Sequence, residues 1–220
     1  NKRIFPNLDS WDNSIIRECR GLIVSNKTGK ILARRFQKFF NINENEESSL
    51  ENILTLETKY DAIVMNKLDG SLISPILLDD RSMIWATKKS RIVCVENFVE
   101  NNTKYDYNKF VQEWISKGYT PLFEWCDSER DVGVLHYDKS SLTLLAIRHN
   151  IDGSYLDLDK IKNKINIPMI ETTKLKSLKD LIKNISEMKN KEGIVIRFSN
   201  GQMFKLKTDW YTSLAYAKKH

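Results

Sequence analysis

The side chains most able to do chemistry are five charged residues that lie within or beside apolar segments. Lys67 ends an apolar run and is followed at once by an Asp-Gly turn. An ammonium group in such a place can be held fixed and partly desolvated, and desolvation lowers the pKa of lysine toward its neutral, nucleophilic form. Taken alone, K-x-D-G is also the pattern of a plain hairpin turn. The other four residues are Glu124, Glu192, Lys205 and Lys207.

These four residues occupy segments with the composition of strands. Glu124 stands inside an apolar segment and Glu192 stands just before another one. Lys205 and Lys207 alternate with apolar residues, so one face of a strand would carry both. Charges buried on a strand face cost free energy unless they are paired or bound to a ligand. One nucleophilic lysine, two carboxylates and two cationic lysines together indicate a nucleotide and metal site.

The elements that must position these residues are short strands joined in hairpins, with helices between the groups. The apolar patterns predict strands over residues 21–24, 31–34, 60–66, 71–78, 83–87, 121–125, 142–148, 194–198 and 203–207. They predict helices over 47–57, 107–115 and 177–190, and a further helix from residue 209. Because the strands do not alternate singly with helices, the predicted fold class is α+β, with antiparallel sheets flanked by helices.

Composition excludes several classes of protein. The chain has 220 residues, of which 41% are hydrophobic and 29% charged, so it can bury a core and is not disordered. No apolar run approaches the roughly 18 residues of a membrane span, and we expect no membrane partner. The three cysteines are far apart and the three histidines are scattered, so we expect an intracellular protein without disulfides or a zinc site.

The charge is unevenly distributed along the chain. Residues 160–220 carry 14 basic and 5 acidic residues, whereas residues 1–159 carry 21 basic and 24 acidic ones. A basic C-terminal quarter predicts a polyanionic partner, for which nucleic acid is the usual one. A solvated lysine-rich helix face is the alternative, and an AT-rich genome would also raise the number of lysines.

Four short motifs, in their order and spacing, resemble those of the covalent nucleotidyltransferase superfamily of RNA ligases, DNA ligases and mRNA capping enzymes. They are Lys67-x-Asp69-Gly70 (K-x-D-G), Phe123-Glu124, Glu192-Gly193-Ile194-Val195 (E-G-I-V) and Lys205-x-Lys207 (K-x-K). Other segments are similar to the bacteriophage T4 RNA ligase 1 family, so the resemblance covers nearly the whole chain. Those segments are Arg20-Gly21-Leu22-Ile23, Lys38-Phe39-Phe40-Asn41, Thr87-Lys88 and Lys207-Thr208-Asp209-Trp210-Tyr211. The resemblance implies the ATP-grasping nucleotidyltransferase ligase fold and one adenylyltransferase domain over residues 1–220. The further C-terminal domain usual in that family is expected to be absent, so the chain is either a fragment or a minimal ligase.

The resemblance also implies a reaction in three steps. Lys67 attacks the α-phosphorus of ATP and forms a lysyl-adenylate, the AMP moves to a 5′-phosphate on RNA, and a 3′-hydroxyl then displaces the AMP and seals the strand. The implied cofactors are ATP and Mg²⁺ or Mn²⁺, and the partner is RNA with 5′-phosphate and 3′-hydroxyl ends. A monomer is expected. A cytoplasmic or nuclear location, a viral or phage origin and the RNA that is sealed stay open, and the family makes a tRNA the natural candidate for that RNA.

The resemblance gives roles to the carboxylates and lysines. Glu124 would lie near the ribose and Glu192 nearer the metal, and both are hard oxygen donors that suit Mg²⁺ or Mn²⁺. Salt-bridged strand carboxylates are the alternative. Lys205 and Lys207 would contact the α-phosphate and help pyrophosphate to leave, while a lysine of a solvated strand is the alternative for Lys207.

Five further residues are implied as ATP contacts. Arg20 and Lys38 would bind the β- and γ-phosphates or shape the pocket, and Lys88 would contact phosphate or RNA. Gly70 would let the backbone approach the nucleotide closely. Phe40 would pack near the adenine, with core packing of Phe39 or Phe40 as the equal alternative.

Two other functions compete with an RNA ligase. One is a DNA ligase or a GTP-using capping enzyme of the same superfamily, against which the segment Lys38-Phe39-Phe40-Asn41 argues. The other is an RNA-binding module that has lost the reaction. A binding module has no need of a lysine nucleophile, so the presence of all five charged residues argues against it.

Overall fold

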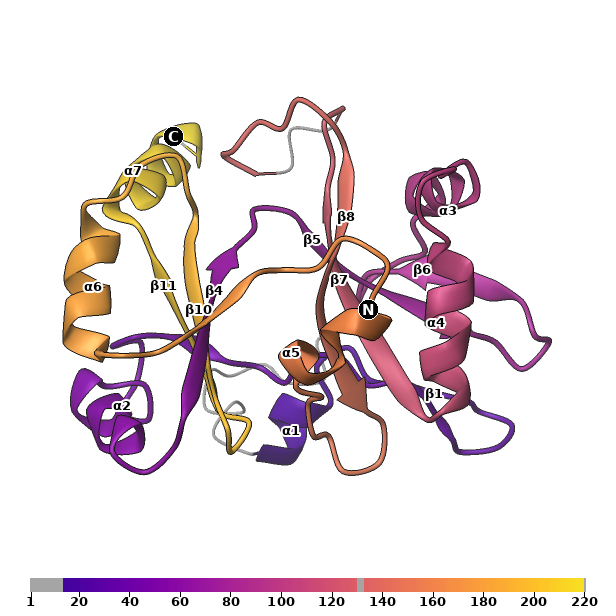
Figure 1. The fold of residues 1–220 in the computed structure, drawn as a ribbon, viewed down its shortest axis with the longest axis horizontal. Helices are drawn as coiled ribbons and strands as arrows, with labels where there is room; N and C mark the ends of the chain where they lie inside the picture. The colour runs from indigo at the N-terminus through magenta and orange to yellow at the C-terminus, as the bar shows by residue number, and fades with distance from the viewer. Residues whose placement is uncertain (1–13, 130–132, 220) are drawn as a thin grey trace. The chain divides into compact units, whose positions relative to one another are not determined.

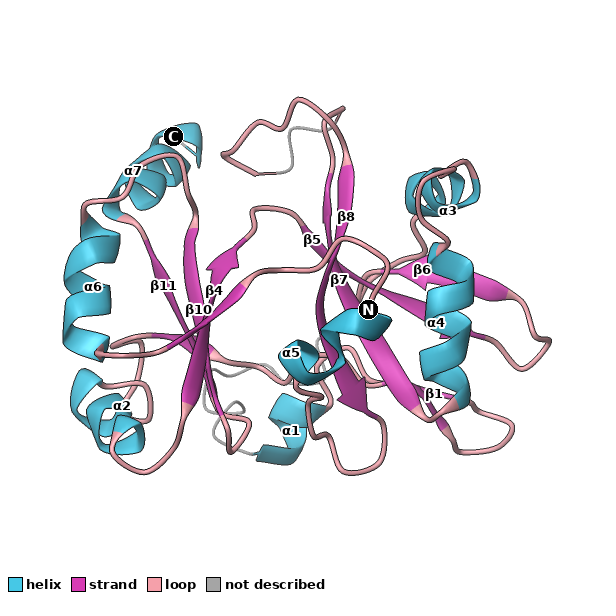
Figure 2. Cartoon of the chain, in the orientation of Figure 1, coloured by secondary structure: helices cyan, strands magenta, loops and turns pink. Residues whose placement is uncertain are grey.

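The computed structural model describes residues 14–129 and 133–219, and the fold is α+β as predicted (Figures 1 and 2). The helices are α1 Ser14–Glu18, α2 Leu50–Glu57, α3 Val93–Glu100, α4 Tyr107–Ser116, α5 Leu158–Ile161, α6 Leu178–Ser186 and α7 Asp209–Lys219. The strands are β1 Ile23–Val24, β2 Ile31–Ala33, β3 Phe40–Asn41, β4 Ala62–Lys67, β5 Ser71–Leu77, β6 Met83–Ala86, β7 Tyr119–Cys126, β8 Ser141–His149, β9 Thr172–Lys174, β10 Gly193–Phe198 and β11 Met203–Lys207. Among the described residues, no helix is long and apolar enough to cross a membrane.

The chain divides into two compact units. The first unit consists of Asn1–Lys38, Leu72–Phe123 and Ala146–Ile167, and the second of Phe39–Ser71, Glu124–Leu145 and Pro168–His220. The five charged residues singled out in the sequence all belong to the second unit. The single domain expected over residues 1–220 stays a prediction, because compact units can belong to one domain.

Within the part of the chain that the structure describes, the strands form three sheets. The second unit contains a five-stranded sheet of order β3-β11-β10-β4-β9, in which β10 is antiparallel to both β11 and β4. The other two sheets are the β1-β2 hairpin and a four-stranded sheet of order β6-β5-β7-β8. The predicted hairpins β1-β2, β5-β6 and β10-β11 are confirmed. We expected antiparallel sheets, but one strand pair differs, because the short strand β3 pairs in parallel with β11.

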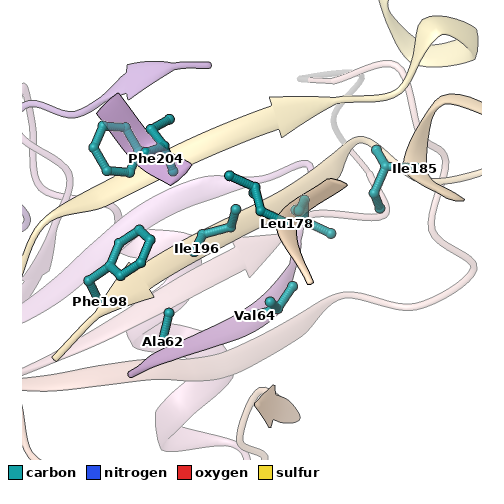
Figure 3. Packing of buried hydrophobic residues seen from close by; sticks show 9 residues of the cluster. Ala62, Val64, Leu178, Ile185, Ile196, Phe198 and Phe204 are labelled. Atoms are coloured by element: carbon teal, nitrogen blue, oxygen red, sulfur yellow. The ribbon is translucent and has the colours of Figure 1, made fainter. Parts of the chain in front are cut away.

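Alternation along the strands divides the five-stranded sheet into two faces. On one face, residues of β4, β10 and β11 pack against helices α2 and α6 (Figure 3). The buried members of this core are Ile53, Ala62, Val64, Leu178, Ile185, Ile194, Ile196, Phe198 and Phe204. Successive side chains of a strand point to opposite faces, so Lys67, three residues after Val64, lies on the other face.

Helix α6 follows its sequence signals closely at the start and less closely at the end. The Ser177 side chain accepts a hydrogen bond from the Asp180 backbone N–H, as the S-x-x-D pattern predicts. The helix ends at Ser186 instead of near Asn190, which has a positive φ of 59°. Its Leu178 and Ile185 are buried against the sheet, whereas its lysines Lys179 and Lys183 are exposed.

We predict that Ile196→Ala destabilises the fold strongly, because Ile196 is fully buried in the core between the sheet and α6. Removing its side-chain atoms should leave a cavity and lower the free energy of unfolding by about 2–5 kcal/mol. Chemical denaturation measures this loss. The control Ile151→Ala changes a residue that is 77% exposed and should stay within about 0.5 kcal/mol of the parent. Equal effects of the two substitutions would contradict the described core.

Candidate active site

Three neighbouring strands of the five-stranded sheet bring the candidate residues to one end of the sheet. Gly193, the first residue of β10, pairs with Lys67 of β4 on one side and with Lys207 of β11 on the other. Glu192 directly precedes Gly193 in the chain. The antiparallel register therefore places the end of the K-x-D-G strand, the start of the E-G-I-V strand and the K-x-K strand side by side.

The Glu192 carboxylate bridges the two lysines. Its Oε2 lies 2.8 Å from Nζ of Lys67 and its Oε1 lies 3.0 Å from Nζ of Lys207. The Glu192 side chain is 4% exposed, whereas that of Lys67 is 24% exposed and that of Lys207 is 37% exposed. A buried carboxylate is costly without partners, so the two ammonium groups compensate Glu192. The ammonium groups keep accessible surface from which they can reach an anionic ligand.

Glu124 of β7 is a second carboxylate of this site. Burial raises its pKa to about 8, although attraction from the Lys67 ammonium acts in the opposite direction. Repulsion from Glu192 also raises the pKa of Glu124, whereas a hydrogen bond from the Gly70 backbone N–H lowers it. Lys67, Glu192 and Glu124 thus influence one another, and the burial of Glu124 favours its neutral form.

Two glycines allow the backbone to come this close. A Cβ atom at Gly70 would collide with the backbone carbonyl of Trp125 and would crowd the side chain of Glu124. Gly193 has a φ of +155°, and a Cβ atom there would collide with the Leu206 carbonyl oxygen. Gly70 is therefore needed where the turn after Lys67 packs on β7, and Gly193 is needed where β10 packs beside β11.

The structure also brings in Asp69, to which the sequence analysis gave no role. Its Oδ2 accepts hydrogen bonds from the backbone N–H groups of Val134 and Leu135, at 2.6 and 2.9 Å. Its Oδ1 accepts a hydrogen bond from the Tyr211 hydroxyl at 2.8 Å. Asp69 and Tyr211 lie in motifs that the sequence displays, but the loop that supplies Val134 and Leu135 has no recognisable pattern.

Aromatic rings lie next to both lysines of β11. Nζ of Lys205 is 5.4 Å from the ring centroid of Phe39, and Nζ of Lys207 is 4.8 Å from that of Tyr211. Phe40 is 6% exposed and pairs in register with Phe204 of the core. This arrangement is the packing alternative considered for Phe40, and it is Phe39 that accompanies a site lysine. A contact between Phe40 and adenine stays a prediction.

The first unit carries a cluster of cations that includes three predicted site residues. The pKa of Lys88 is lowered by desolvation and then by repulsion from Arg20, Lys89 and Lys38. Burial also lowers the pKa of Arg20. Mutually repelling cations are stabilised by an anion, so this cluster suits phosphate groups.

Arg35 does not join this cluster as a ligand-binding residue. It is 2% exposed, and its guanidinium donates to Ser74 Oγ and to the carbonyl oxygens of Gly21 and Ala86. These three hydrogen bonds link Arg35 to other segments of the first unit.

The donor set fits a metal ion that arrives with its own ligands. Within residues 14–129 and 133–219, no group of three or more His, Cys, Asp or Glu residues could hold a metal ion. Glu124 and Glu192 supply two carboxylates. Mg²⁺ is usually bound by one or two carboxylates together with substrate phosphates and water. These residues therefore suit a cation that enters with a nucleotide.

Comparison with known proteins gives consistent matches over most of the chain. A protein-family model described as RNA ligase matches residues 18–211. A putative RNA ligase of Thermovibrio ammonificans is 31% identical over 219 residues, which cover 94% of this chain and 55% of that protein. The chain thus spans about half the length of this relative.

Solved structures of low sequence identity share the fold. An archaeal ATP-dependent RNA ligase has a TM-score of 0.66 at 12% identity, and the match covers 90% of this chain and 54% of that one. A variant of a Naegleria gruberi RNA ligase, solved with ATP and Mn, has a TM-score of 0.52 at 13% identity, covering 82% of this chain and 58% of that one. Both matches show that the chain shares the fold of these ligases.

We predict that Glu124 makes the stability of the unliganded chain depend on pH. Its pKa of about 8 in the folded chain is above its ordinary value of 4.5, so the protonated carboxyl is favoured by folding. The stabilisation is complete below about pH 4.5 and is lost as the pH rises through about 8. Glu124→Gln stays neutral, so its thermal midpoint should fall less than that of the parent between about pH 5 and pH 9.

The control for this measurement is Glu46→Gln, because Glu46 is exposed. It should leave the pH dependence of the thermal midpoint as in the parent. Identical pH profiles of Glu124→Gln and the parent would show that the carboxyl of Glu124 is not desolvated as described.

Proposed function

This chain belongs to the RNA ligase family, and we propose that it is the ATP-dependent adenylyltransferase part of an RNA ligase, which joins 5′-phosphate and 3′-hydroxyl ends through a lysyl-AMP intermediate. The observation that carries the proposal is the bridge from Glu192 to both Lys67 and Lys207 at the ends of three adjacent strands. This bridge joins the lysine that we propose as the nucleophile to a carboxylate and a second cation at one end of the sheet. A plain hairpin turn at Lys67 would not require this arrangement.

In the proposed first step, Nζ of Lys67 attacks the α-phosphorus of ATP. A P–N bond forms, the bond between the α-phosphorus and the bridging oxygen breaks, and pyrophosphate leaves. An ammonium group has no lone pair, so Lys67 must first lose a proton. Oε2 of Glu192 already accepts a hydrogen bond from Nζ, so this oxygen orients the amine and is the nearest acceptor for its proton.

The remaining cations would neutralise charge during the transfer. Lys205 and Lys207 lie on the same face of β11 as each other, and charge grows on the α-phosphate and on the departing pyrophosphate. Arg20 and Lys38 of the first unit are proposed contacts of the β- and γ-phosphates, and their neighbour Lys88 is a proposed contact of phosphate or RNA.

Glu124 and Glu192 would hold Mg²⁺ or Mn²⁺ together with the phosphates of ATP. When bound, this ion supplies positive charge that neutralises the phosphate oxygens. The Naegleria gruberi ligase with ATP and Mn supports ATP and a divalent cation as cofactors. The raised pKa of Glu124 means that a cation would displace its proton on binding. Gly70 would let the turn beside Glu124 approach the nucleotide.

In the later steps the AMP would pass to the 5′-phosphate of RNA, and a 3′-hydroxyl would then displace it. An RNA partner follows from the family, whereas the requirement for these ends, a monomeric state and an intracellular location stay proposals.

Labelled ATP and labelled GTP, each incubated with the protein and Mg²⁺ before a denaturing gel, separate the alternatives. Label from ATP supports a ligase, label from GTP indicates a capping enzyme, and no label indicates a binding module. Sealing of RNA but not DNA ends then distinguishes an RNA ligase from a DNA ligase.

We predict that Lys67→Ala and Lys67→Arg both abolish covalent labelling by ATP. Arginine keeps the positive charge opposite Glu192 but does not lose its proton at accessible pH, so it cannot attack phosphorus. Labelling on a denaturing gel measures the effect, and thermal unfolding checks that each variant is folded. The matched control Lys59→Arg changes an exposed lysine and should keep full labelling. Covalent AMP on Lys67→Arg would refute Lys67 as the nucleophile.

The lysines of the α6 region should contribute little to RNA binding. The sequence suggested that they add to a basic surface, but α6 covers the face of the sheet opposite to that of Lys67. If each of Lys176, Lys179 and Lys183 contacted a phosphate, replacing all three with Ala would reduce the slope of log affinity against log salt by about 2. We predict a change of less than about 0.5 in that slope. A reduction near 2 in titrations with single-stranded RNA would show instead that α6 binds RNA.

A further inference from the structure

The loop formed by residues 133–137, between β7 and β8, is tied to the turn that follows Lys67. Two of its backbone N–H groups, those of Val134 and Leu135, donate to Oδ2 of Asp69. In the opposite direction, the Asp69 backbone N–H donates to the Tyr137 hydroxyl at 3.0 Å. Asp69 is 9% exposed, so these hydrogen bonds are largely shielded from water. The turn is therefore held both through the carboxylate of Asp69 and through the backbone N–H of Asp69.

The Tyr137 hydroxyl is itself held in place. It is hydrogen-bonded to the thiol of the buried Cys126 at the end of β7. Cys126 lies two residues from Glu124 in the same strand. Tyr137 thus connects the strand that carries one candidate carboxylate with the turn that carries the candidate nucleophile. Deleting its hydroxyl oxygen would leave the Asp69 N–H without this acceptor.

Gly133 shows how closely the loop approaches the turn. A Cβ atom at Gly133 would collide with all three carboxyl atoms of Asp69. Its carbonyl oxygen accepts a hydrogen bond from Nζ of Lys218 in α7, at 2.6 Å. Tyr211 of α7 donates to Asp69 as well. The loop and the helix therefore reach the same carboxylate, and a side chain at residue 133 would push the loop away from it.

We propose that Tyr137 is a positioning residue for the attack of Lys67, a role that rests on the proposed lysyl-AMP chemistry. Tyr137 acts through the backbone of Asp69, two residues beyond the nucleophile, and needs no contact with the nucleotide. Attack on phosphorus requires the amine to be in line at short range, and a displacement of about 1 Å can cost about 100-fold in rate. Tyr137 fixes the turn and thereby fixes the position of Nζ.

The test is Tyr137→Phe, which removes one oxygen atom and keeps the ring. We expect the rate of lysyl-AMP formation at saturating ATP to fall by about 10-fold or more, from the loss of nucleophile alignment. The ATP concentration that gives half the maximal rate should change by less than about 2-fold, because the phosphate-binding cations are unaltered. Rates are expressed per molecule of folded protein, which removes the effect of lowered stability. The matched control Tyr60→Phe changes a tyrosine that is 40% exposed and should keep the parent rate.

Each outcome decides the proposal. The proposal would be overturned if the rate of lysyl-AMP formation in Tyr137→Phe were unchanged. It would also be overturned if only the ATP concentration that gives half the maximal rate changed. If Tyr137→Phe does not fold, Gly133→Ala decides, because it keeps the tyrosine and displaces the loop from Asp69, and the same fall in rate is expected. A parent protein that forms no lysyl-AMP would overturn the proposed function. If the parent forms lysyl-AMP and both variants form it at the rate of the parent, only the positioning role of Tyr137 is overturned.

Discussion

The arrangement of the site depends on one buried carboxylate that is shared by two ammonium groups. Glu192 would be unstable in the interior without Lys67 and Lys207, and each lysine is brought to it by its pairing with Gly193. The core packed against α2 and α6 fixes the strands, and the strand register fixes the charges. The hydrophobic face of the sheet thus determines the spacing of the polar groups on the opposite face.

Much of this could be predicted from the sequence, where local pattern decides the structure. The turn in the β10-β11 hairpin, the Ser177 cap of α6 and the alternation around Lys205 are short-range signals, and the structure confirms the elements that they predict. The closeness of Lys67 and Glu192, which are 125 residues apart, is different. The residue pattern alone indicated only that these charged strand residues need partners of opposite charge or a ligand. The order of the motifs, through the family resemblance, indicated that Lys67 and Glu192 belong to one site.

The features that could not be predicted depend on tertiary contacts. The strand β3 has two residues and pairs in parallel with β11, so no periodicity announces it. The burial of Phe40 follows from that pairing, because a double phenylalanine does not show which ring faces the core. Asp69 is visible in the sequence only as a turn residue. Its hydrogen bonds come from a loop and a helix that are remote along the chain.

The ion pair between Lys67 and Glu192 also has a consequence for the chain at rest. An amine reactive enough to attack phosphorus would also react with any stray electrophile that reached it. Held as an ammonium against a carboxylate, Lys67 has no free electron pair to offer. The contact that would position the proposed nucleophile would therefore also keep it unreactive until a ligand competes for Glu192, so that the proposed reactivity is withheld until a substrate is present.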